Sequence, residues 1–162
     1  YNSVPVPEPY NIALGALYSR NIENLMMAGR NISNTHVAFS STRVMATCSA
    51  IGQAVGTVAA QCAAHNILPR SLRNDAARLT RLQQVLLRDD QTIRHLKNED
   101  PDDLARMASV RASSQHEDAA PENVANGWTR DRPGQWKNRW AGTLQEDGAW
   151  IKLSWDKPVT IS

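Results

Sequence analysis

The longest uninterrupted pattern in the chain runs from Thr42 to His65, where no proline occurs and small apolar residues dominate. A stretch of this length without proline predicts one long helix. We expect a side-chain oxygen of Ser41 or Thr42 to cap its first turn. Asn66 and Pro69 are expected to end it.

A second, shorter helix is predicted from Asp75 to Arg88, because apolar residues recur there at helical spacing. The positions of this stripe are Ala76, Leu79, Leu82, Val85 and Leu86. We also expect a short capped helix at residues 100–105, where a proline follows Asp100 and suits the first position of a helix.

Strands are predicted at three places along the chain. Residues 24–29 (Asn-Leu-Met-Met-Ala-Gly) form a short apolar run that stops at a glycine, which favours a buried strand. The polar residues 30–42 that follow are expected to be irregular. Residues 107–113 and 150–155 alternate between apolar and polar side chains, as the strands of a sandwich do.

Charged and aromatic residues divide the 162-residue chain into three parts. Residues 1–70 carry four Arg and two Glu, residues 71–106 are densely charged, and residues 107–162 hold all five Trp. We therefore expect two structural units with a helical spacer between them, and boundaries near residues 70 and 106.

The composition excludes several classes of protein. The formal net charge of +2 is too small to indicate a nucleic-acid partner. No apolar run of about 18 residues occurs, so no membrane span is expected. Two Cys cannot form a disulfide framework. If the long helix forms, Cys48 and Cys62 lie about 21 Å apart along it, too far for a disulfide. No histidine has a partner at metal spacing, so no metal site is predicted.

The candidate chemistry lies between Asn24 and Ala60. A helix start presents free backbone N–H groups and partial positive charge, and these suit an anion or a polarised carbonyl. Arg30 and Arg43 add full positive charges at either end of the loop before the predicted long helix.

Gly52 and Gly56 lie one turn apart on one face of the predicted long helix. A surface this bare permits the close approach of a flat cofactor or of another backbone. Ordinary packing of a small-residue helix against a sheet explains the same pattern, and spacing alone favours that alternative.

The same stretch resembles a known family. The segments that carry the resemblance are Leu25-Met-Met-Ala-Gly-Arg-Asn-Ile-Ser33, Thr35-His-Val-Ala-Phe39, Ser41-Thr-Arg-Val-Met45 and Gly52-Gln-Ala-Val-Gly56. Together they resemble the C-terminal flavin motif of the FAD-dependent oxidoreductases related to glutathione reductase and fumarate reductase. The resemblance implies an α/β fold, the C-terminal part of an FAD/NAD(P)-binding fold with a strand, a loop, a long helix and a helical spacer. A partial β-sandwich is expected to follow.

The resemblance also implies roles for individual residues, with FAD as the cofactor. The implied cofactor-binding residues are Gly29, Arg30, Asn31, Ser41, Thr42 and Arg43. The Gly29–Asn31 turn would lie against the ribityl and pyrophosphate part of FAD, and the helix start near Thr42 would face the pyrimidine edge of the flavin. The N–H dipoles and the charge of Arg43 would stabilise the negative charge that hydride transfer leaves there.

His36 and Arg43 are the implied catalytic residues. His36 is the only candidate acid/base group in the loop, and an imidazole can exchange a proton with a substrate near neutral pH. The alternatives are that His36 caps a loop carbonyl, or that it contacts the flavin without titrating.

Enzymes of this class also need a Gly-x-Gly-x-x-Gly turn to hold the pyrophosphate. That pattern does not occur in this sequence. We therefore expect the chain to be the C-terminal part of a longer flavoprotein, with the missing N-terminal part as its partner. Alone, it is expected neither to hold FAD tightly nor to turn over its substrate, an unknown small molecule or carbohydrate.

Residues 107–162 resemble the start of a galactose-binding-like, discoidin-type β-sandwich. The similar segments are Ala112–Ser114, Asn123–Gly127, Trp136–Trp140 and Trp150–Pro158. Exposed Trp side chains would stack on sugars, which gives an alternative function as a carbohydrate-binding or adhesion module attached to a polysaccharide-processing protein. A small aromatic core without a ligand explains the same residues, and is favoured because Trp150 and Trp155 flank an alternating strand. The compartment is left open, although sandwiches of this type are commoner outside the cytoplasm.

Overall fold

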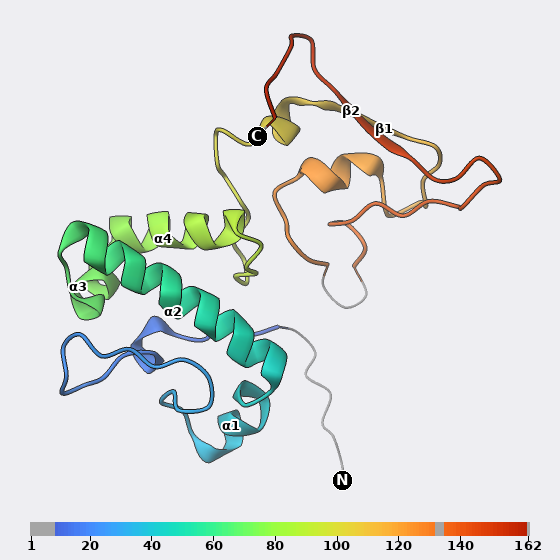
Figure 1. The fold of residues 1–162 in the computed structure, drawn as a ribbon. Coiled ribbons are helices and arrows are strands. Elements are labelled where there is room, and N and C mark those ends of the chain that lie inside the picture. The colour runs from blue at the N-terminus through green and yellow to red at the C-terminus, as the bar shows by residue number, and fades with distance from the viewer. Residues whose placement is uncertain (1–8, 132–134, 162) are drawn as a thin grey trace. The chain divides into compact units, whose positions relative to one another are not determined.

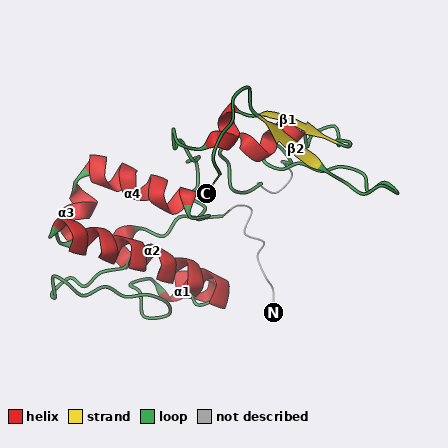
Figure 2. Ribbon diagram, turned by 45° about the horizontal axis from the view of Figure 1, so that its top comes forward, coloured by secondary structure: helices red, strands yellow, loops and turns green. Residues whose placement is uncertain are grey.

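The chain forms two compact units in the computed structural model, which describes residues 9–131 and 135–161 (Figure 1). The helical unit comprises residues 11–91. The β unit comprises the described part of residues 92–161 together with Pro9 and Tyr10. Helices dominate the first unit, and the two strands belong to the second (Figure 2). The structure is thus mixed α/β, while the boundaries near residues 70 and 106 stay predictions.

The helical unit contains one 3₁₀-helix and four α-helices. They are η1 (Leu14–Ala16), α1 (His36–Thr42), α2 (Met45–His65), α3 (Pro69–Asn74) and α4 (Ala76–Arg88). The helix predicted from the apolar stripe is confirmed as α4. Asp75 caps it, because its carboxylate accepts a hydrogen bond from the backbone N–H of Arg78 at 3.0 Å.

The long helix is confirmed over most of its length, but its predicted start is wrong. α1 ends at Thr42 and α2 begins at Met45 after the extended residue Val44. Val44 is therefore the N-cap of α2, and it makes no side-chain cap hydrogen bond. The hydroxyl groups of Ser41 and Thr42 instead donate to the carbonyl of Ala38, one turn earlier in α1.

The segment before this helix also differs from expectation, whereas the helix ends where it was expected to end. Residues 30–42 are not irregular throughout, because Thr35 caps α1 through its side chain. At the far end, Asn66 adopts a left-handed conformation (φ 50°) and stops α2 as predicted. Pro69 then begins α3, where a proline fits the first turn.

The buried strand predicted at residues 24–29 is wrong. Met26 makes a single antiparallel bridge with Tyr18, and Leu25 is 40% exposed. The reason is the lack of a partner, since no named strand lies in residues 11–91 to extend the pairing.

Two groups of buried apolar side chains hold the helical unit together around α2. At one end, Leu17, Ile32 and Ile51 form a buried cluster that fixes the segment after Gly29 against the helix. Near the other end, Val58 and Cys62 of α2 are buried, as are three leucines of α4. The α2 helix is therefore the scaffold on which the candidate site residues are arranged.

The β unit has a two-stranded antiparallel sheet, β1 (Ser109–Ala112) and β2 (Ile151–Ser154), in which Val110 lies opposite Leu153. Both strands were predicted from alternation and are confirmed. The described residues form this one sheet, whereas a sandwich needs two packed sheets.

Short 3₁₀-helices complete the β unit, η2 (Leu104–Met107) and η3 (Pro121–Ala125). The helix expected at residues 100–105 is displaced, because Asp103 rather than Asp100 caps a helical turn. The indole N–H of Trp155 donates to the carbonyl of Leu104 at 2.7 Å. Across both units, none of the described helices has the length and apolar character to cross a membrane.

Candidate functional site

The turn at Gly29 is held beside the first turn of α2. Gly29 has φ +88°, and a Cβ placed on it would lie 4.0 Å from both Cβ and Sγ of Cys48. The thiol of Cys48 in turn donates to the backbone carbonyl of Thr42 at 3.5 Å. A sharp backbone turn, the end of α1 and the start of α2 therefore meet around one side chain.

The beginning of α2 is open to solvent. Its N-cap residue Val44 is 53% exposed and Met45 is 87% exposed. No side chain of the described residues caps the free N–H groups of the first turn, so the partial positive charge of a 21-residue helix faces an accessible surface.

Arg30 and Arg43 both lie next to Phe39 of α1. The guanidinium carbon of Arg30 is 5.6 Å from the centre of the Phe39 ring. Arg43 is the C-cap of α1, and its backbone N–H donates to the carbonyl of Phe39 at 3.2 Å. The structure thus places the Arg30 guanidinium and the backbone of Arg43 beside the same residue, and both arginines are exposed.

Thr42 has a structural role in this arrangement. Its side chain is 4% exposed and accepts a hydrogen bond from the side-chain amide of Asn34 at 3.0 Å. Asn34 was missed by the sequence reasoning, as was Phe39. No periodic pattern links Asn34 to Thr42, so the sequence offered no signal for their contact.

His36 is the first residue of α1 and is exposed. It lies seven positions before Arg43, which places both residues on one side of the helix and about 10 Å apart along its axis. The ring of His36 has no hydrogen-bond partner among the residues that the structure describes.

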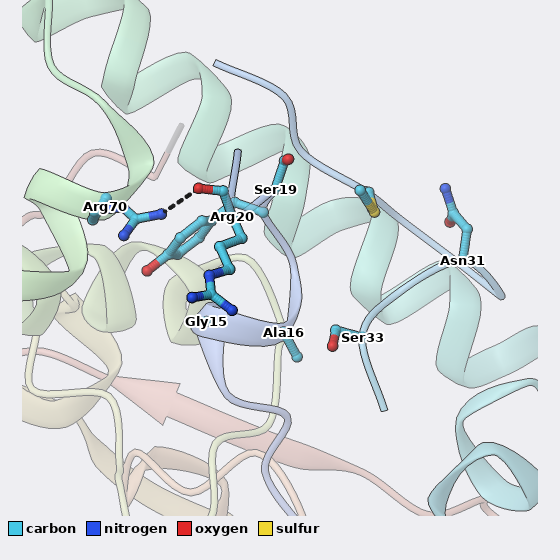
Figure 3. Close-up of a pocket in the computed structure, with 9 residues that line it drawn as sticks. Gly15, Ala16, Ser19, Arg20, Asn31, Ser33 and Arg70 are labelled. Carbon is cyan, nitrogen blue, oxygen red and sulfur yellow. Dashed lines mark hydrogen bonds between the residues drawn. The ribbon is translucent and has the colours of Figure 1, made fainter. Parts of the chain in front are cut away.

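Asn31 lines a different surface. It borders a pocket of about 520 Å³ in the helical unit, together with Ser33, Arg20 and Arg70 (Figure 3). Gly29 and Arg30 do not line this pocket. Asn31 is accordingly set apart from the residues gathered at the start of α2.

The small-residue face of α2 is bare. A Cβ placed on Gly52 or on Gly56 would meet no described atom within 4 Å. Packing of these glycines against a sheet, the alternative that spacing favours, is therefore not found within the described part of this chain.

The described cysteines and potential metal ligands form neither a disulfide nor a metal site. Cys48 and Cys62 are both free thiols, and burial raises the pKa of Cys62. Within residues 9–131 and 135–161, no group of three His, Cys, Asp or Glu side chains could hold a metal ion.

Four of the five tryptophans, all but the half-buried Trp128, fall into two groups. Trp136 and Trp150 are 43% and 51% exposed, and the guanidinium of Arg139 lies 4.3 Å from the Trp136 ring centre. Trp140 and Trp155 are half-buried and donate their indole N–H groups to backbone carbonyls.

Two protein-family models match the chain, and they cover two separate stretches of it. A family model described as FAD dependent oxidoreductase matches residues 1–86, which include every candidate site residue. A model described as a domain of unknown function (DUF7402) matches residues 103–162. No curated protein and no solved structure matches the chain. The second match gives no support to the galactose-binding-like or carbohydrate-binding interpretation of the β unit.

Proposed function

Because the chain belongs to the FAD-dependent oxidoreductase family, we propose that it is the C-terminal segment of such an enzyme and contributes the loop and helix start that face the flavin. The observation that carries the proposal is the uncapped, exposed start of α2 beside the Gly29 turn. Bound FAD would supply the hydride chemistry, which no side chain can perform alone.

The residues at this surface fit an anionic cofactor. Gly29 has no side chain to block the approach of a ligand to the backbone, and its positive φ is one that glycine adopts without strain. The N–H groups of the first turn of α2 and the guanidinium groups of Arg30 and Arg43 are donors with positive charge or partial charge. Their joint effect is to stabilise negative charge on a ring held against them.

We assign the remaining residues to supporting and proton-transfer roles. Asn34 and Thr42 fix the junction between α1 and α2, and Ser41 stabilises the last turn of α1 through Ala38. Asn31 extends the contact surface away from α2. His36 holds or delivers a proton on the substrate side, at the opposite end of α1 from Arg43.

The partner in this proposal is the part of the flavoprotein that carries the pyrophosphate-binding turn. This sequence contains no Gly-x-Gly-x-x-Gly pattern. The bare face around Gly52 and Gly56 is where the partner's backbone would pack. The substrate, a small molecule or a carbohydrate, binds between the two parts.

Absorption spectroscopy of purified protein tests the proposal. The chain expressed alone is expected to lack the visible absorption band of a bound flavin. Co-expression with the N-terminal part encoded upstream is expected to yield a complex that retains FAD through gel filtration. Retention of stoichiometric FAD by the chain alone, or a complex that holds no flavin, would overturn the proposal.

A further inference from the structure

The pocket of about 520 Å³ lies between the loop after η1, the segment after Gly29 and the start of α3. Its size falls in the range of small-molecule sites. Nine residues line it: Gly15, Ala16, Tyr18, Ser19, Arg20, Met27, Asn31, Ser33 and Arg70. Apart from Asn31, none of them belongs to the proposed flavin-facing surface.

The pocket carries concentrated positive charge. Arg20 and Arg70 line it, and the guanidinium of Arg73 lies 3.4 Å from the position of a Cβ on Gly15. Glu23 is the only acidic residue between residues 9 and 74. No carboxylate of the described residues forms an ion pair with any of the three arginines.

Arg70 is held in place by other contacts, although no described carboxylate pairs with it. Its Nη2 donates to the backbone carbonyl of Arg20 at 3.0 Å, as the dashed line in Figure 3 shows. Its guanidinium carbon also lies 5.7 Å from the centre of the Tyr18 ring. One N–H group is used in this way, so the remaining donors of the fork are available to a ligand.

Hydroxyl groups add donors to the same pocket. Ser19 Oγ accepts the backbone N–H groups of Asn21 and Ile22, at 3.2 and 3.1 Å. Because both of these contacts use its lone pairs, the hydroxyl proton of Ser19 remains to donate. The phenolic oxygen of Tyr18 accepts a hydrogen bond from Nη1 of Arg73 at 3.5 Å. The phenolic proton of Tyr18 can therefore also be donated to a ligand.

We propose that this pocket binds a small molecule through an oxyanion, a phosphate or carboxylate group, with Arg20 and Arg70 as its anchors. Guanidinium forks match the planar oxygen pairs of both groups, and charge-assisted hydrogen bonds are about twice as strong as neutral ones. The anchoring groups of this site lie on the loop after η1 and on α3 rather than on α1 and α2, and Asn31 is the one lining residue that it shares with the proposed flavin-facing surface.

Nuclear magnetic resonance titration of the whole chain tests this site with inorganic pyrophosphate and, separately, with citrate. We expect saturable shifts with a dissociation constant of about 1 mM or tighter, centred on the amides of residues 15–20, 31–33 and 70. Stronger binding of pyrophosphate identifies a phosphate ligand, and stronger binding of citrate identifies a carboxylate ligand.

Arg20→Gln and Arg70→Gln are each expected to weaken binding about tenfold or more, because a hydrogen bond from a charged donor is removed. Arg70→Lys keeps the charge but loses the fork, and is expected to bind more weakly than wild type and more tightly than Arg70→Gln. The control is Arg88→Gln, which removes the same charge from the last turn of α4 and should bind as wild type does. Unchanged spectra elsewhere in the chain verify that each variant is folded.

The proposal is overturned if neither probe gives saturable shifts at these amides. It is equally overturned if Arg20→Gln and Arg70→Gln bind as tightly as Arg88→Gln. The titration contains no flavin. A negative result therefore does not count against the proposed FAD site, and a positive result does not require that site.

Discussion

Gly29 and Cys48 are nineteen positions apart in the sequence, yet a Cβ placed on Gly29 would lie 4.0 Å from both Cβ and Sγ of Cys48. This contact sets the Gly29 turn against the first turn of α2. It leaves room for a methyl group, so glycine is required here by the backbone conformation (φ +88°) rather than by space.

Gly29→Ala should therefore destabilise the helical unit by about 1–2 kcal/mol, because an L-residue is strained at positive φ. Urea unfolding followed by circular dichroism measures the change. Gly52→Ala is the matched control, since Gly52 lies inside α2 with nothing near its Cβ position. That variant should gain roughly 0.5–1 kcal/mol in helix propensity. Equal losses in the two variants would show that the Gly29 conformation is not the cause.

Asp75 gives the stability of α4 a dependence on pH. The backbone N–H of Arg78 is the main cause that holds the pKa of Asp75 below its ordinary value. A lowered pKa in the folded state contributes stability above the ordinary pKa, and that contribution is lost as the pH falls through the folded value.

Asp75→Asn keeps a capping oxygen but removes this titration. Between about pH 7 and about pH 3, the urea midpoint should fall more in wild type than in Asp75→Asn. Other carboxylates titrate in both proteins, so the difference between them isolates Asp75. Parallel pH profiles would contradict the assignment.

Trp155→Phe should destabilise the β unit by about 1 kcal/mol, since the carbonyl of Leu104 loses its indole donor. Trp150→Phe is the control, because Trp150 is 51% exposed and its replacement should change stability by less than about 0.5 kcal/mol. Thermal unfolding followed by near-ultraviolet circular dichroism reports on both. If Trp150→Phe costs as much as Trp155→Phe, the hydrogen bond to Leu104 is not the source.

Gly52→Leu separates the isolated chain from the assembled enzyme. In this chain the new side chain would meet no described atom around its Cβ, so the free energy of unfolding should rise by roughly 0.5–1 kcal/mol through helix propensity. In the complex with the N-terminal part, the same leucine should block close packing and lower the FAD content of the purified complex. A variant complex with full FAD content would mean that this face of α2 is not the contact.

The sequence predicts well those elements whose determinants are local. The apolar stripe and Asp75 define α4, and Asn66 ends α2 because its short polar side chain tolerates the left-handed conformation. The alternation of residues 109–112 and 151–154 defines the two paired strands.

Elements that depend on non-local partners could not be predicted in the same way. The strand expected at residues 24–29 needs a neighbour to complete its hydrogen bonds, and among the described residues only Tyr18 supplies a bridge. The break at Val44 interrupts a run with no proline, so nothing in the local pattern marks it. In the candidate site, the roles of Gly29, Arg30 and Arg43 stay predictions that rest on a resemblance. The contacts of Arg30 with Phe39 and of Thr42 with Asn34 arise only from folding, and no local pattern marks them.

The most direct test of the flavin-facing role of this surface is the reduction potential of FAD in the complex with the N-terminal part. Arg43→Ala removes a positive charge next to the start of α2, so we expect the potential to fall by about 30 mV or more, which is about 1.4 kcal/mol for a two-electron couple. Arg81→Ala, which removes a charge from the part of α4 beside Gln61 and His65 at the other end of α2, should leave the potential unchanged. Identical potentials in the wild-type and Arg43→Ala complexes would contradict the placement of this surface against the flavin.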